Sequence, residues 1–90
     1  MLRYEDCLAL AELDEGEVEA VARHEHLPEM LALALAQYLC QSATGERCVK
    51  RMILDDIEQA RAAGNPAEAA RLKLVLRHFC ETHPRAAAAA

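Results

Sequence analysis

The stretch PEMLALALAQYLCQ, residues 28–41, decides which fold class the sequence predicts. Large apolar side chains alternate with alanine throughout it, and Glu29 is its only charged residue. Proline fits the first position of a helix, so we expect a helix to begin at Pro28. Because apolar residues surround this helix on nearly every side, we predict that it lies at the centre of a bundle. It is shorter than the roughly 20 apolar residues that a membrane span requires.

Two shorter helices are expected before this segment. Residues 4–13 place apolar side chains on one side of a short helix. A second helix is expected to begin after Asp14, because an acidic cap followed three residues later by Glu17 matches a capping box. Its apolar stripe continues as far as Glu25.

Two longer helices are expected after it. Thr44 is the expected cap of a helix over about residues 46–63, whose apolar residues have the spacing of one face. The segment AGNPAE, residues 63–68, then supplies a glycine that ends this helix and an asparagine and a proline that begin the next. A link this short predicts an antiparallel hairpin.

The composition favours an all-α fold. Valine and isoleucine together supply six residues against 19 alanines and 13 leucines, so a sheet has little to build with. A hydrophobic content of 53% is too high for a disordered chain. We therefore predict one domain over residues 1–84, a compact bundle of about five helices. Residues 85–90, an arginine and five alanines, are expected to be a frayed tail or an artificial extension.

The charge distribution points to protein partners. Residues 1–30 hold nine acidic and two basic residues, whereas the remaining residues hold six acidic and eight basic ones. The net charge of −5 argues against nucleic-acid binding, which requires a concentrated basic face, although Arg71, Lys73 and Arg77 make the last helix partly basic. The first residues lack the pattern of a secretory signal, so we expect a cytoplasmic location with reduced cysteines.

One candidate site combines thiols with an imidazole. In the predicted bundle, Cys40, Cys48, Cys80 and His83 fall at one end, and four such groups can bind zinc or copper. The spacing contains no Cys-x-x-Cys motif. Two other interpretations therefore stay open: the cysteines are small apolar core residues, or two of them form a redox pair.

A second candidate is a carboxylate that faces the core. Asp56 falls within the apolar stripe of its predicted helix, and Glu25 continues the stripe of an earlier one. A buried carboxylate must be paired, hydrogen-bonded or protonated, so a structural ion pair, a subunit interface and a catalytic or metal-binding role all remain open. The neighbouring residues His24 and His26 have no metal-binding spacing and are typical of a solvated helix end.

Three segments resemble sequences of small bacterial helical proteins of unassigned function. They are residues 14–29, RMILDDI at residues 51–57 and LVLRHF at residues 74–79. The resemblance covers most of the chain and implies a bacterial, cytosolic setting. It implies no activity and no site residues.

These observations favour a non-catalytic interaction or adaptor protein. The helix over residues 28–41 offers more apolar surface than a chain of 90 residues easily covers, so a homodimer is expected, or a complex with another protein. The alternative is a small metal-binding or thiol-redox-responsive protein that uses the cysteine and histidine cluster. Neither hypothesis involves a membrane or a nucleic acid.

Overall fold

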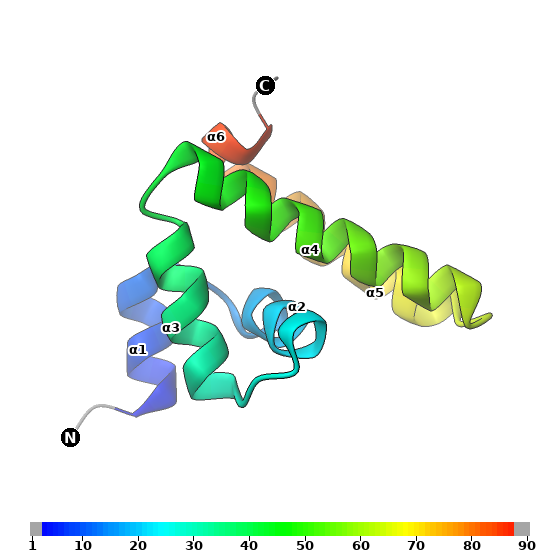
Figure 1. Ribbon diagram of the computed structural model, residues 1–90, viewed down its shortest axis with the longest axis horizontal. Helices are drawn as coiled ribbons and strands as arrows, with labels where there is room; N and C mark the ends of the chain where they lie inside the picture. The colour runs from blue at the N-terminus through cyan, green and yellow to red at the C-terminus, as the bar shows by residue number, and fades with distance from the viewer. Residues whose placement is uncertain (1–2, 88–90) are drawn as a thin grey trace.

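The structure is a computed structural model, and it describes residues 3–87. It is all-α, and within residues 3–87 it contains no strand (Figure 1). Its helices are α1 (Tyr4–Ala11), α2 (Glu15–Glu25), α3 (Glu29–Leu39), α4 (Ala43–Ala62), α5 (Pro66–Thr82) and α6 (Pro84–Ala87). The predicted fold class is confirmed. No helix in this part of the chain is both long enough and apolar enough to cross a bilayer.

The predicted hairpin of the last two long helices is present, and it is formed by α4 and α5, the two longest of the described helices. Asn65 caps α5 through its side chain, Pro66 occupies the first turn, and Gly64 adopts a positive φ of 70° in the link. In Figure 1, α4 and α5 run alongside each other over most of their length. Ile53, Leu72 and Phe79 are fully buried in this region.

The central helix is α4, and our prediction that α3 lies at the centre is wrong. α4 is 20 residues long and packs against α2, α3, α5 and α6. α3 has 11 residues and buries only one face, through Ala32, Leu33 and Ala36. Two of these three residues are alanines, which allow close helix packing but bury little area. The opposite face of α3 therefore stays in contact with solvent.

The start of α4 differs from the prediction because of a close approach between helices. The Ser42 hydroxyl, rather than Thr44, caps the helix by accepting a hydrogen bond from the backbone N–H of Gly45 at 3.0 Å. Gly45 is buried inside the first turn, where a Cβ atom would overlap the carbonyl oxygen of Leu39. Glycine thus acts here as a contact point between α3 and α4.

The assignment of residues 85–90 to a tail is also wrong for the part that the structure describes. Residues 84–87 form α6, which packs against α4 and α5, and Ala86 is buried. Pro84 can begin a helix at this point because it needs no hydrogen-bond acceptor for its nitrogen. Arg85 attaches the segment to α4 by an ion pair with Glu46. Residues 88–90 lie outside the described part.

Candidate functional site

The predicted set of three thiols and one imidazole does not assemble: within residues 3–87, its ligand atoms do not come close enough to one another to hold a metal ion. Cys40 and His83 line a common pocket of about 520 Å³. Cys48 is exposed and Cys80 is partly buried, and neither lines that pocket. His83 turns inward at the end of α5 and stacks on Phe79, with ring centroids 4.3 Å apart. Cys48 lies on the solvent side of α4, so the helix packing itself separates the four groups.

The thiol of Cys40 is not suited to redox chemistry. Burial, reinforced by the negative charges of Glu46 and Glu17, raises its pKa to about 11. A thiol reacts as its thiolate, so a raised pKa makes it inert at neutral pH. Among the interpretations left open by the sequence, this cysteine fits that of a small apolar residue.

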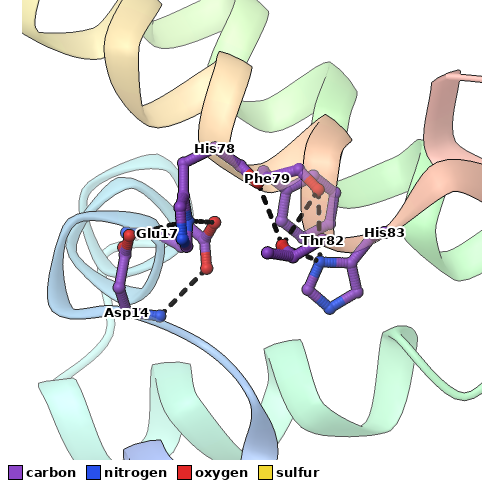
Figure 2. A network of polar contacts seen from close by, with 6 residues as sticks. All are labelled: Asp14, Glu17, His78, Phe79, Thr82 and His83. Carbon is purple, nitrogen blue, oxygen red and sulfur yellow. Dashed lines mark hydrogen bonds and ion pairs between the residues drawn. The ribbon is translucent and has the colours of Figure 1, made fainter.

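The strongest cluster of chemically active groups joins the start of α2 to the end of α5. Asp14 and Glu17 form the predicted capping box: Oδ1 of Asp14 accepts from the N–H of Glu17 at 2.8 Å, and Oε1 of Glu17 accepts from the N–H of Asp14 at 2.9 Å. Nδ1 of His78 lies 2.8 Å from Oε2 of Glu17 and 2.9 Å from Oδ2 of Asp14. Figure 2 shows the three side chains pointing toward one another.

Burial and pairing change the acidities in this cluster. Glu17 is almost fully buried, and burial raises its pKa although hydrogen bonds from the Asp14 backbone and from His78 act against this shift. The hydrogen bond to Glu17 raises the pKa of His78. Both shifts therefore make the proton shared by His78 and Glu17 harder to remove than a proton on either group alone in water.

A short polar chain continues from this cluster toward the pocket. The Thr82 hydroxyl donates to the carbonyl oxygen of His78 at 3.0 Å and lies 2.9 Å from Nδ1 of His83 (Figure 2). These contacts give the Thr82 hydroxyl and Nδ1 of His83 hydrogen-bond partners in the last turn of α5. They orient His83 and do not create a nucleophile.

A second buried carboxylate lies at the pocket. Oε2 of Glu46 accepts hydrogen bonds from Nε and Nη2 of Arg85 at 3.1 and 2.6 Å, and Nη2 also donates to the carbonyl oxygen of Cys40. Oε1 of Glu46 is buried with no hydrogen-bond partner among the described residues. This pair connects α6 to α4 and to the end of α3.

The prediction that Asp56 is buried is confirmed. It is 2% exposed, neither carboxylate oxygen has a hydrogen-bond partner within residues 3–87, and burial raises its pKa. The ion pair that we weighed for it does not form. The neighbouring Asp55 instead pairs with His24 and with Arg51.

The prediction that Glu25 faces the core is wrong. Glu25 is exposed and pairs with Nδ1 of His24 at 2.7 Å. α2 ends at Glu25, and His26 then takes a left-handed conformation with a φ of 57°. The apolar stripe of α2 therefore ends about one turn before Glu25, and does not include it.

Sequence reasoning missed the burial of Glu17 and Glu46. The capping box was a usable signal for Glu17. It places this side chain in the first turn of α2, and where that turn packs on another helix, one of its faces must be buried. Glu46 carried no such signal, since its partner lies 39 residues away in a segment that we expected to be a tail.

One surface feature stands apart from these polar clusters. On α3, Met30, Leu31 and Tyr38 are 52%, 57% and 71% exposed. Leu10 of α1 and Leu74 of α5 are exposed to a similar degree. Single exposed apolar residues are normal, but three large ones on one helix of 11 residues form an apolar face of the kind that marks an interaction site.

Comparison of this chain with protein-family models, with curated proteins and with solved structures finds no match.

Proposed function

We propose that this chain is a non-catalytic interaction protein that forms a homodimer through the exposed face of α3. The observation that carries the proposal is the exposure of Met30, Leu31 and Tyr38 on one short helix. A small domain covers a modest fraction of its apolar surface by itself, and association removes the remainder from water.

The pattern of side-chain sizes on this face favours a second copy as the occupant. Leu31, Ala34 and Tyr38 are all exposed and have the spacing of three and four residues that places them along one seam. They follow the order large, small, large. In an antiparallel pair of α3 helices, Leu31 of one copy lies opposite Tyr38 of the other, and the alanines meet near the two-fold axis. Such a face is complementary to itself, as a two-fold interface requires.

The charges on α3 are compatible with this arrangement. Glu29, at the start of the helix, is its only charged residue. Two α3 helices in antiparallel orientation keep these two carboxylates at opposite ends of the interface, so the centre brings no like charges together. A core without charges is typical of protein interfaces.

The proposed setting is the cytoplasm. The four cysteines are free and distributed over the fold without a partner thiol, which fits a reducing compartment.

Light scattering coupled to size exclusion tests the proposal directly. The wild-type protein is expected to show the mass of a dimer at high concentration and to shift toward the monomer on dilution. Leu31→Lys places a positive charge on each side of the two-fold seam and is expected to give a monomer. Leu74→Lys is the matched control, because Leu74 is 65% exposed on α5 and the dimer should persist.

Two results would overturn the proposal. The first is a wild-type protein that stays monomeric at all accessible concentrations, which would leave the face for a different partner, such as a basic amphipathic helix. The second is an equal loss of the dimer in both variants. Circular dichroism of each variant confirms that the helices remain folded.

A further inference from the structure

We propose that Asp14, Glu17 and His78 form a binding site for a divalent transition-metal ion, with Zn²⁺ as the best fit. This inference is independent of the proposed homodimer, because it concerns the junction of α2 and α5 and not the exposed face of α3. The three potential ligand atoms, Oδ2, Oε2 and Nδ1, all lie within 4.8 Å of one another.

The orientation of the two carboxylates is fixed before any ion binds. Each uses one oxygen in the capping box, Oδ1 of Asp14 and Oε1 of Glu17, and each directs the other oxygen at His78. In metal sites, hydrogen bonds to the non-ligating atoms of a ligand fix its direction in the same way. The backbone of the first turn of α2 supplies those bonds here.

Where the three side chains meet, there are more hydrogen-bond acceptors than hydrogens to share between them. Nδ1 of His78 carries at most one hydrogen, and two carboxylate oxygens lie within 2.9 Å of it. One N–H cannot donate a linear hydrogen bond to both. A cation at this point contacts all three atoms at once, which the single proton does not.

The other histidine with two carboxylates shows why this geometry is specific. His24 contacts Glu25 through Nδ1 and Asp55 through Nε2. These nitrogens lie on different edges of the ring, so no single ion can contact the imidazole and both carboxylates. Among the histidines that the structure describes, only His78 directs one nitrogen at two carboxylates.

The ligand set and the exposure select the class of ion. One imidazole and two carboxylates suit Zn²⁺, whose bonds to nitrogen and oxygen of about 2.0–2.2 Å place tetrahedral ligands about 3.3 Å apart. The observed separations of 2.8 and 2.9 Å must therefore widen slightly. Asp14 and His78 are both about half exposed and have room to move, and water can fill the fourth position.

Binding replaces a proton by the ion. Zn²⁺ takes the lone pair of Nδ1, so a hydrogen on this nitrogen must leave it, to Nε2 of a neutral ring or to the buffer when Nε2 already carries one. The positive end of the α2 dipole opposes a cation at this position, so we expect binding to be weaker than the same three ligands would give away from a helix N-terminus.

Calorimetric titration of the full chain with Zn²⁺, after removal of metals by a chelator, tests the site. The expected result is a stoichiometry of one ion per chain. Asp14→Asn keeps the helix cap, because asparagine caps as well as aspartate, and is expected to weaken binding about tenfold or more. His78→Ala is expected to do the same, and His24→Ala is the matched control that leaves binding unchanged.

The site is overturned if the wild type takes up no Zn²⁺ at about 1 mM. The proposed site is equally overturned if Asp14→Asn and His78→Ala bind Zn²⁺ as tightly as the wild type does. That result would indicate that the ion binds to the cysteines instead. Co²⁺ as a spectroscopic probe separates these cases, because thiolate ligands give charge-transfer bands that imidazole and carboxylate do not. Loss of the dimer in the α3 variants has no bearing on either outcome.

Discussion

The α4–α5 hairpin and α3 use apolar residues in opposite ways. The hairpin has a clear apolar stripe on each helix, and Ile53, Leu72 and Phe79 in it are completely buried. α3 has a single charged residue among its 11 and yet leaves Leu31 and Tyr38 more than half exposed. An apolar stripe tells which side of a helix will face the core. A helix that is apolar on all sides does not tell this, because any of its sides could be the buried one. Its surplus face is then available to a partner.

The largest expected effect is on the hairpin itself. Leu72→Ala removes a fully buried side chain and is expected to lower the free energy of unfolding by about 2–5 kcal/mol. Leu31→Ala removes the same atoms from an exposed site and is expected to change it by about 0.5 kcal/mol or less at concentrations where the protein is monomeric. Urea denaturation followed by circular dichroism measures both. Equal losses in the two variants would contradict the contrast between the regions.

A smaller effect tests whether α6 belongs to the domain. Arg85→Ala leaves Glu46 buried without its ion-pair partner, and we expect a loss of about 1–2 kcal/mol, reduced because Arg85 is half exposed. Arg61→Ala is the control, since Arg61 pairs with Glu58 on the surface and is expected to contribute about 0.5 kcal/mol or less. If both variants match the wild type in thermal denaturation, residues 84–87 are a tail after all.

The smallest effect is a pH dependence at the contact between α2 and the hairpin. The pKa of His78 is raised in the folded state, chiefly by its hydrogen bond to Glu17. The stabilisation is therefore complete below the unfolded pKa and is lost as the pH rises through the folded pKa. We expect the free energy of unfolding to fall by a few tenths of a kcal/mol from this group as the pH rises above the ordinary histidine pKa of about 6.5, since the histidine is half exposed.

The variant His78→Gln separates this contribution from that of His24, whose pKa is also raised. Its free energy of unfolding is expected to depend less steeply on pH than that of the wild type over the same range. A variant with an unchanged slope would show that the ion pair does not hold α2 to α5 in solution. Burial raises the pKa of Glu17, so this carboxyl group contributes to the pH dependence with the same sign.

Local signals allowed most of the helices to be predicted from the sequence. Asp14 with Glu17, and Asn65 with Pro66, contain their cap within a few residues, so the starts of α2 and α5 could be located. Gly45 shows where such signals fail. A glycine ends a helix in one context and permits a close approach in another, and the contact with Leu39 that decides between these roles depends on how α3 packs.

The candidate sites were predicted less well, because they depend on contacts between distant residues. The stripe on α4 located Asp56 correctly, since burial of that residue follows from one helix alone. The pairs of Glu17 with His78 and of Glu46 with Arg85 span 61 and 39 residues, and no local pattern announces them. The cysteines show the opposite error, a site that was predicted but is not formed. Residues at the same end of a predicted bundle need not direct their side chains toward one another.

Hydrogen–deuterium exchange at two protein concentrations tests most directly whether a second copy covers the exposed face of α3. Between about 1 μM and about 200 μM, the amides of α3 are expected to become more protected, while those of the α4–α5 hairpin exchange at the same slow rate throughout. The variant Leu31→Lys should abolish the change. Exchange in α3 that is independent of concentration in the wild-type protein would contradict the proposed homodimer.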